Sequence, residues 1–499
     1  QRFPNRLALI QGDKKYTYED LYKEVGRMAS SLQRLGVSKN DRVLVLLKNR
    51  VETVILFWAI QKLGAIFTPV NIRLSVEDIQ YCVNDVEAKY IIFEKICAPA
   101  VSWKNFKERP ILIGLHEDNV DITYQELRKF GVADSFYPTK IDDNDLSVIL
   151  YTSGTTGKPK GVPRSHQNEY ESTVAHILQS YYQMFENTLG AMPLHHTMGI
   201  RSLLSMNILN GTYIAVPDFD PSECADIIKK EKVSCLYLTP TMYHDLVHHA
   251  LINKMEFPKL NSLVYAGSPM TNDLVYQCNK IFRPKYFVNH YGSTEIYTFT
   301  TYSNVREKPG CAGKPGIHQR IRLVIPDPER SVSPDQEVKK GEVGEIIVDM
   351  QSSEAFRGYW NRPDATRKAI KDGWYFTGDL GKIDEDGDLY VVGRIDEMIL
   401  SGGENIHPQQ IECVLKEHPK VLDVVVTGEE DKRWGQLVVA FVVYKDKITA
   451  QELDRFCKQH KKLPNYMRPR KYIFINEIPR NNSGKVDYHN LRKYKEPLI

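Results

Sequence analysis

The sequence predicts an α/β fold divided into a large N-terminal and a smaller C-terminal domain. Its 499 residues exceed what one hydrophobic core usually organises. Over the first three quarters, short β-branched runs alternate with amphipathic helical stretches, a pattern typical of largely parallel sheets covered by helices. After about Arg394 the pattern changes to a few strands, two helices and a basic tail, which suits a small α+β domain. We therefore predict an N-terminal domain over residues 1–394 and a C-terminal domain over residues 395–499.

The individual elements follow from β-branched runs and from helical periodicity. In the N-terminal domain, strands are expected at 42–47, 90–93, 146–150, 212–216 and 263–266, and helices at 51–63 and 221–230. The apolar stretch 54–70 is interrupted by Gln61 and Lys62, so it predicts a buried helix leading into a strand and not a membrane span. In the C-terminal domain, strands are expected at 421–426 and 437–444, and helices at 408–417 and 449–461. The short polar segment 394–396 suits a hinge better than a flexible linker.

Composition excludes several classes of protein and partner. Hydrophobic residues make up 42% and charged residues 26% of the chain, which is an ordinary globular balance. The formal net charge of +3 is small for this length, so neither nucleic acid nor a membrane surface is an expected partner. The eight cysteines are scattered without a C-x-x-C pair, which favours free thiols over a disulfide framework or a zinc site. We therefore expect a cytoplasmic protein.

A glycine-rich loop at residues 151–161 (YTSGTTGKPKG) carries the strongest functional signal. Its glycines let backbone amides approach an anion, while hydroxyl and lysine side chains add donors and positive charge. The loop differs from a Walker A motif because Pro159 follows Lys158. The residues predicted to bind phosphate are Thr152, Ser153, Gly154, Thr155, Thr156, Gly157 and Lys158.

This loop resembles the phosphate-binding motif of the adenylate-forming superfamily, which includes acyl- and aryl-CoA synthetases, adenylation domains of peptide synthetases and beetle luciferases. The resemblance runs from about Phe3 to the C-terminus, with several motifs in the expected order. It implies stacked α/β subdomains in the N-terminal domain and a C-terminal domain that rotates about a hinge at Asp396. It also implies ATP, Mg²⁺, coenzyme A and a small carboxylic acid as ligands.

The segment 289–295 (NHYGSTE) resembles the family's nucleotide motif. The resemblance implies that Tyr291 stacks on adenine, that Thr294 bonds the α-phosphate and that Glu295 holds the magnesium ion. A carboxylate suits this role because Mg²⁺ prefers hard oxygen ligands. The remaining residues implied in nucleotide binding by this segment and by its neighbour at 265–268 are Gly267, Ser268, Asn289, His290, Gly292 and Ser293.

Three further residues are assigned to the nucleotide and to catalysis by resemblance. Asp379, in the segment 373–379, is expected to accept hydrogen bonds from the ribose hydroxyls, and Arg394 is expected to support the ribose and phosphate. Lys485, in the segment 479–485, is expected to bridge the substrate carboxylate and the α-phosphate. A preorganised cation there would lower the barrier between two reacting anions.

The acid pocket is expected between segments 193–199 and 265–268 and the residues around Tyr297. His196 matches a histidine that gates the acyl carboxylate in relatives and completes the catalytic set with Glu295 and Lys485. Arg201 is a candidate for binding an anionic substrate tail, and facing solvent is the alternative. The predicted pocket residues are His195, His196, Met198, Gly199, Tyr265, Gly267, Gly292 and Tyr297.

The coenzyme A site is expected in the C-terminal domain. In relatives, the Gly402–Gly403 stretch lines the pantetheine tunnel, and glycine suits a thin arm that passes close to backbone. The string 431–436 (DKRWGQ) resembles the chlorobenzoate– and related benzoate–CoA ligases, which makes Trp434 a candidate contact of the pantetheine arm. Arg468 is a candidate for the CoA phosphates.

These residues predict an AMP-forming acid–CoA ligase that acts on a small aromatic or medium-chain acid. The first alternative is an adenylating enzyme that loads an acyl or aryl group onto a carrier protein. The second is a non-catalytic acyl-adenylate binder, and a luciferase is a remote third. The sequence leaves a homodimer open.

Overall fold

The structure is a computed structural model that describes residues 2–101, 106–117, 119–132, 139–152, 158–327, 332–402, 404–460, 463–480, 486–491 and 493–494. The chain forms two compact units. Unit 1 contains residues 1–321 and 349–373, and unit 2 contains residues 322–348 and 374–499. The two units are defined by which residues pack together. The predicted division at residues 394–396 instead separates the part of the chain expected to rotate, and it stays a prediction.

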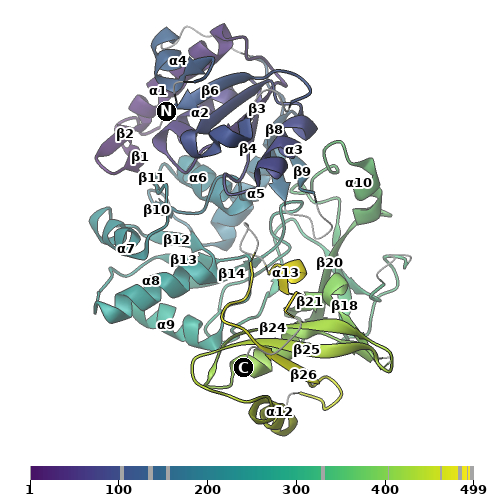
Figure 1. Ribbon diagram of the computed structural model, residues 1–499. Helices are drawn as coiled ribbons and strands as arrows, with labels where there is room; N and C mark the ends of the chain where they lie inside the picture. Colours follow the sequence, from purple (N-terminus) through teal and green to yellow (C-terminus); the bar gives the residue numbers. More distant parts are fainter. Residues whose placement is uncertain are drawn as a thin grey trace. The chain divides into compact units, whose positions relative to one another are not determined.

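Unit 1 is built around two sheets with helices between and beside their strands (Figure 1). One sheet has seven strands, parallel except at the β8–β9 hairpin. In spatial order its strands are β7 (Ile122–Thr123), β6 (Ile111–Leu115), β5 (Tyr90–Glu94), β3 (Arg42–Leu46), β4 (Ile66–Pro69), β8 (Leu146–Thr152) and β9 (Lys160–Ser165).

The other sheet of unit 1 has nine strands, with a parallel centre and antiparallel edges. In spatial order they are β16 (Lys314–Pro315), β15 (Thr300–Tyr302), β14 (Tyr286–Tyr291), β13 (Ser262–Tyr265), β12 (Cys235–Leu238), β10 (Asn187–Gly190), β11 (Thr212–Ala215), β1 (Leu7–Gln11) and β2 (Lys14–Thr17). The main hydrophobic core contains side chains of both sheets, such as Phe67 of β4 and Leu263 of β13.

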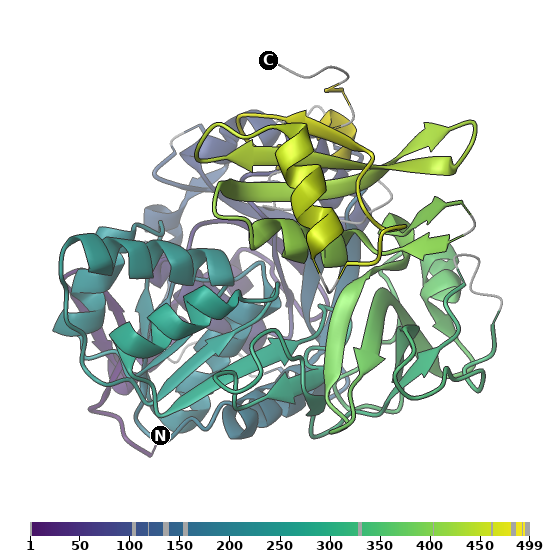
Figure 2. The same cartoon turned by 90° about the horizontal axis from the view of Figure 1, so that it is seen from below.

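The helices of unit 1 begin where the sequence supplies caps. Ser165 caps α5 by accepting the N–H of Asn168, while Pro221 and Pro240 open α7 and α8 in the position where a missing N–H costs nothing. Helices α7, α8 and α9 lie side by side along the nine-stranded sheet (Figures 1 and 2). The helices are α1 (Tyr18–Arg34), α2 (Val51–Lys62), α3 (Val76–Val86), α4 (Tyr124–Phe130), α5 (His166–Gln179), α6 (Thr197–Leu209), α7 (Pro221–Lys230), α8 (Pro240–Ile252), α9 (Asn272–Phe282) and α10 (Pro363–Ala369). A 3₁₀ helix covers Lys95–Val101, and the short strand β19 covers Ile370–Lys371.

Unit 2 contains two smaller sheets. The first joins β17 (Ile321–Val324), β18 (Gly344–Asp349), β20 (Trp374–Ile383) and β21 (Leu389–Arg394), and the 3₁₀ turn η3 (Ile395–Glu397) follows. The second joins β23 (Glu404–Ile406), β22 (Ile399–Ser401), β25 (Gly435–Tyr444), β24 (Val421–Asp431) and β26 (Lys471–Phe474). Its helices are α11 (Pro408–Lys416), α12 (Ala450–Gln459) and α13 (Tyr488–Leu491), and α12 lies across this sheet in Figure 2.

The predicted α/β fold class is confirmed, and each predicted strand and helix is present with ends that differ by at most two residues, except that β24 extends five residues beyond the predicted strand 421–426. The eight cysteines are free, and all except Cys413 are buried, as the sequence predicted. Among the helices of the described part of the chain, none combines the length and apolar character that a bilayer crossing requires. The predicted rotation of the C-terminal domain stays a prediction.

Candidate active site

Two predicted nucleotide segments meet at one edge of the nine-stranded sheet. Gly267 and Ser268 follow the end of β13, and Asn289 lies near the end of β14 beside Tyr265 in the parallel register. The carboxyl ends of neighbouring parallel strands form a common edge, which is where α/β proteins usually bind ligands. Gly267 has φ of 93°, a backbone conformation that favours glycine, and a Cβ there would lie 3.8 Å from Cγ2 of Thr239.

The turn after β14 brings Glu295 into a buried position. Gly292 is required there because a Cβ at this residue would lie 1.9 Å from the carbonyl oxygen of Tyr297. The carboxylate Oε1 of Glu295 accepts a hydrogen bond from the Tyr359 hydroxyl at 2.7 Å. The backbone carbonyl of Glu295 accepts the N–H of Phe356 at 2.9 Å. A buried carboxylate oriented in this way supplies the hard oxygen that Mg²⁺ prefers, so the residue fits its predicted role.

His290 and Asn289 face the interior. The two ring nitrogens of His290 lie 3.3 Å from the hydroxyls of Thr298 and Ser180, and burial lowers the pKa of His290 to about 3. The side chain of Asn289 donates to the carbonyl of Cys311 at 2.7 Å. Both predicted nucleotide residues therefore support the end of β14 from inside, and His290 is neutral at physiological pH.

The hairpin of β8 and β9 holds the ends of the predicted phosphate loop. Thr152 pairs with Lys160 in the antiparallel register. Ser153, Gly154, Thr155, Thr156 and Gly157 lie outside the described residues. Lys158 lies 3.5 Å from a carboxylate oxygen of Asp78, and the ammonium of Lys160 lies 4.4 Å above the ring of Tyr359. Tyr359 therefore contacts both the hairpin and Glu295.

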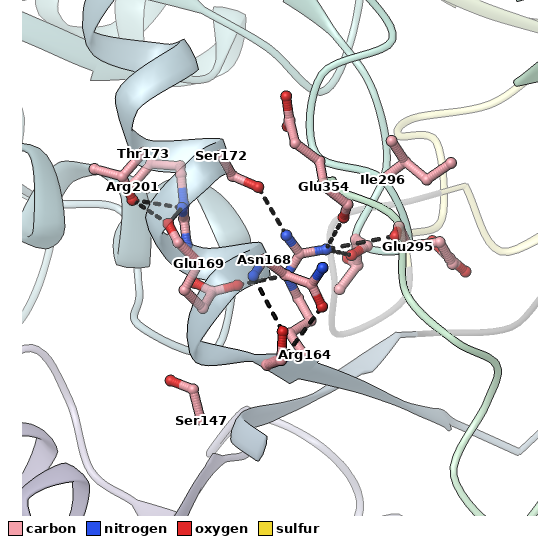
Figure 3. A network of polar contacts seen from close by, with 12 residues as sticks. Ser147, Arg164, Asn168, Glu169, Ser172, Thr173, Arg201, Glu295, Ile296 and Glu354 are labelled. Carbon is pink, nitrogen blue, oxygen red and sulfur yellow. Dashed lines mark hydrogen bonds and ion pairs between the residues drawn. The ribbon is translucent and has the colours of Figure 1, made fainter. Parts of the chain in front are cut away.

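Arg164 of β9 is a residue of this region that sequence reasoning missed. Its side chain is fully buried, and it reaches the turn of the nucleotide motif, as Figure 3 shows. One guanidinium nitrogen, Nη1, donates to the backbone carbonyl of Thr294 at 3.0 Å and lies 3.2 Å from that of Glu354. The only sequence signal was a charged residue inside a short strand next to the glycine-rich loop.

Tyr297 anchors the predicted acid pocket. Its hydroxyl donates to the hydroxyl of Tyr237 at 2.7 Å and lies 3.4 Å from Nδ1 of His176. Burial lowers the pKa of His176 well below its ordinary value, so this imidazole is neutral. Tyr265, on the neighbouring strand, is also fully buried. Tyr297 therefore contacts a polar aromatic pair, Tyr237 and His176, that the sequence analysis did not assign to the pocket.

The histidine pair of the predicted pocket lies where α6 begins. His195 and His196 have ring centroids 4.5 Å apart, and His196 is exposed while Met198 is buried. Burial, together with the neighbouring His196 and Arg73, lowers the pKa of His195 well below its ordinary value. Gly199 is needed because a Cβ there would lie 2.2 Å from the carbonyl oxygen of Pro193.

Arg201 does not face solvent. It is fully buried on α6 and forms an ion pair with Glu169 of α5, while its Nη1 donates to the Thr173 hydroxyl at 2.6 Å. The guanidinium carbon lies 5.3 Å from the ring centre of Tyr297. The solvent-exposed alternative for Arg201 is therefore wrong, and binding a substrate tail stays a prediction.

In unit 2, the predicted ribose residues lie opposite each other. Asp379 of β20 and Arg394 of β21 are register partners, and Nη1 of Arg394 donates to Asp379 at 2.5 Å. Burial acts to lower the pKa of Arg394, but the carboxylates of Asp379 and Asp396 outweigh it, and the pKa is raised. The Arg394 guanidinium therefore holds the Asp379 carboxylate in a defined orientation.

Two of the predicted CoA residues of unit 2 are in contact. The N–H of Gly402 donates to the carbonyl of Trp434 at 2.7 Å, and a Cβ at residue 402 would lie 3.0 Å from the indole ring. Trp434 is 37% exposed, which leaves a surface for a ligand. Arg468 forms an ion pair with Asp454, so binding phosphate would require this pair to open. Gly403 and Lys485 lie outside the described residues.

In this α/β protein, the hairpin that flanks the predicted phosphate loop lies beside a buried glutamate held by a tyrosine hydroxyl, an arrangement that fits a nucleotide-dependent enzyme. Comparison with known families makes this assignment specific. The chain belongs to the AMP-binding enzyme family, whose model matches residues 1–360, and the model of the AMP-binding enzyme C-terminal domain matches residues 410–485. The predicted membership of the adenylate-forming superfamily is confirmed.

Named relatives and solved structures agree with this family. The chain is 30% identical to a 4-chlorobenzoate–CoA ligase of Arthrobacter sp., over 99% of this chain and 93% of that protein. It is 34% identical to a 2-succinylbenzoate–CoA ligase of Bacillus cytotoxicus, over 99% and 96%. It also resembles the o-succinylbenzoate CoA synthetase MenE of Bacillus subtilis in complex with its acyl-adenylate intermediate, with a TM-score of 0.86, 29% identity, and coverage of 99% and 97%.

Proposed function

We propose that the chain is an AMP-forming acid–CoA ligase. It would activate a small aromatic or medium-chain carboxylic acid with MgATP and then transfer the acyl group to the thiol of coenzyme A. The observation that carries the proposal is the position of Glu295. This buried carboxylate is held by Tyr359 next to the hairpin of the phosphate loop, in a chain of the AMP-binding enzyme family.

In the first half-reaction, an oxygen of the substrate carboxylate attacks the α-phosphorus of ATP, and pyrophosphate leaves. Lys485 would bridge the two reacting anions, and Thr294 would hold the α-phosphate. Asp379, oriented by Arg394, would hold the ribose. Mg²⁺ bound at Glu295 would neutralise charge on the phosphates. These roles come from the family resemblance, and the buried Glu295 and the Asp379–Arg394 pair support them.

In the second half-reaction, the CoA thiolate attacks the acyl carbonyl, and AMP leaves with the electron pair of the broken bond. Gly402 and Trp434 support a site for the pantetheine arm, because the indole covers a glycine that has no side chain to obstruct a ligand. Residues 395–499 would rotate about Asp396 between the two steps.

The substrate class is proposed from the acid pocket and from the relatives. The similar proteins are named for 4-chlorobenzoate and 2-succinylbenzoate, which are aromatic acids. Behind Tyr297, the side chains of Tyr237 and His176 fill the interior and have ring centroids 4.7 Å apart. Because these bulky side chains lie directly behind the predicted acid pocket, they favour a compact acid over a long acyl chain as the substrate.

The experiment is a panel of benzoates, hydroxycinnamates, 2-succinylbenzoate and short-to-long fatty acids with ATP, Mg²⁺ and CoA. Equal amounts of AMP and acyl-CoA should form with at least one compact acid. Release of AMP without acyl-CoA, even at saturating CoA, would favour the carrier-loading alternative. Pyrophosphate exchange that is absent with every acid would favour a non-catalytic binder.

The localisation and the oligomeric state of the enzyme can each be tested separately. Free buried thiols are consistent with a cytoplasmic enzyme, which fractionation of the source cells would test. Sedimentation of the purified chain would decide between a monomer and a homodimer.

A further inference from the structure

We propose that Arg164 is a positioning residue that sets the geometry of the metal-binding turn around Glu295, without touching the nucleotide. The inference rests on the proposed function, because it assigns Mg²⁺ to Glu295. It adds a residue that none of the sequence motifs contains. Figure 3 shows Arg164 reaching from its strand to the two separate loops that carry Glu295 and Glu354.

The geometry points to the backbone of the turn. Nη1 of Arg164 donates to the carbonyl of Thr294 at 3.0 Å and lies 3.4 Å from the carbonyl of Glu295. It also lies 3.2 Å from the carbonyl of Glu354. Thr294 and Glu295 are the residues assigned to the α-phosphate and to the metal. One guanidinium therefore holds the main chain of both.

The opposite side of the same guanidinium is fixed to α5. Nε donates to the carboxylate of Glu169, and Nη2 donates to the hydroxyl of Ser172 at 2.9 Å. Helix α5 also holds the neighbouring loop, because the side chain of Asn168 donates to the carbonyl of Ser353 at 2.8 Å. The planar fork of arginine donates in several fixed directions at once, which a lysine ammonium on a flexible stem does not reproduce.

Burial explains why such a contact is rigid. Arg164 is fully buried, so water does not compete for its donors. Burial lowers its pKa to about 10, and the guanidinium remains protonated at neutral pH. Its charge is compensated by the buried carboxylate of Glu169. Small displacements of groups around a reacting centre reduce rates strongly. Loss of the hydrogen bonds from Arg164 should therefore displace Glu295 from its position.

Arg201 offers a matched control in the same cluster. It is equally buried, and it pairs with the same Glu169. Arg201 also donates to the carbonyl of Glu169 and to the hydroxyl of Thr173, both on α5. Removing either arginine removes one buried cation, but only Arg164 donates to the carbonyls of Thr294 and Glu295.

The test compares Arg164→Lys and Arg164→Met with Arg201→Lys and Arg201→Met. The first readout is the rise in Tm that ATP causes at increasing Mg²⁺ concentrations, and the second is ATP–pyrophosphate exchange. We expect both Arg164 variants to need about tenfold more Mg²⁺ than the wild type for half of the maximal rise in Tm and for half-maximal pyrophosphate exchange. We expect the Mg²⁺ requirement of the Arg201 variants to stay within about twofold of the wild type, whatever their effect on the exchange rate itself.

The outcomes are distinct. Equal shifts in the Arg164 and Arg201 variants, or wild-type behaviour of Arg164→Lys, would overturn the proposal, because general packing or charge alone would then explain the effect. If an arginine variant does not fold, Ser172→Ala and Thr173→Val replace it. Ser172→Ala loosens Arg164 and should raise the Mg²⁺ requirement, and Thr173→Val loosens Arg201 and should not. A wild-type protein that ATP and Mg²⁺ do not stabilise would instead contradict the proposed function.

Discussion

Asp379 and Arg394 are direct partners across two antiparallel strands, and the Nη1–Oδ1 distance between them is 2.5 Å. They were assigned to the ribose from separate segments of the sequence, and the structure brings them together. Nε of Arg394 also donates to Asp396 at 3.0 Å. Arg394 therefore donates hydrogen bonds both to Asp379, the proposed ribose ligand, and to Asp396, the proposed pivot.

Asp379→Ala should weaken ATP binding more than acid binding. A ribose contact contributes mainly to ground-state binding, so we expect the KM for ATP to rise about tenfold and the KM for the acid to change little. Steady-state kinetics with each substrate varied in turn is the measurement. Asp386→Ala, which removes an exposed carboxylate at the turn between β20 and β21, is the control. A larger rise in the KM for the acid would refute the ribose assignment.

Asp396→Pro should impair the thioester step and leave pyrophosphate exchange measurable. Asp396 lies in the 3₁₀ turn η3 after β21, and proline would fix its φ near about −65°. Hinges absorb large backbone changes in a few such residues. Asp396→Ala is the matched control, because it also removes the bond to Arg394 but leaves the backbone free. Single-turnover rates that fall equally in both variants would point to the lost bond and not to a pivot.

Lys485→Ala should slow adenylation by about 10²-fold or more, the scale seen when one preorganised charge stabiliser is lost. Thioester formation from presynthesised acyl-AMP should be far less affected, because that step does not bring the two anions together. Rapid-quench measurement of each half-reaction tests this, with Lys493→Ala as a control at an exposed lysine. Equal losses in both half-reactions would be incompatible with the assigned role.

Tyr359→Phe should raise the Mg²⁺ concentration needed for half-maximal pyrophosphate exchange. The variant removes the hydroxyl that donates to Glu295 at 2.7 Å and keeps the ring. Loss of one such hydrogen bond costs about 1 kcal/mol, so a rise of about fivefold is expected. Tyr243→Phe is the control, because it removes another buried hydroxyl that donates to the carbonyl of Val264 at 2.8 Å. Similar Mg²⁺ requirements in the two variants would contradict the prediction.

Glu412→Gln should stabilise the C-terminal region above neutral pH. Burial raises the pKa of Glu412 from 4.5 to about 7 in the folded chain, while its backbone contact is an N–H of Val426 at 2.8 Å. Between these pH values the folded state binds more protons than the unfolded state, so stability falls as the pH rises through this window. The glutamine keeps an acceptor oxygen and carries no charge.

We therefore expect Glu412→Gln to exceed the wild type in unfolding free energy by on the order of 2 kcal/mol at high pH and to match it at low pH. Thermal unfolding of both proteins at pH values on either side of the window is the measurement. Glu430→Gln, at an exposed glutamate of β24, is the control for the loss of a carboxylate charge. A stability difference that does not change with pH would show that folding does not raise the pKa of Glu412.

The sequence alone determined the fold class, the family, and a number of individual strands and helices. Alternating apolar runs report burial locally, so elements such as β3 and α7 could be predicted within a residue or so. The family motifs are contiguous strings, and their order along the chain carries the resemblance without any knowledge of packing. Asp379, Glu295 and Trp434 could be named for the same reason.

Only the tertiary structure decided which side chains support these residues. Arg164 reaches Thr294 across 130 positions of sequence, and Tyr359 reaches Glu295 across 64. The structure also showed that Arg201 is buried. The physical reason is that a charged or aromatic side chain has the same local pattern whether it faces water or a distant backbone carbonyl. Its role depends on long-range contacts that form only when two sheets share one core.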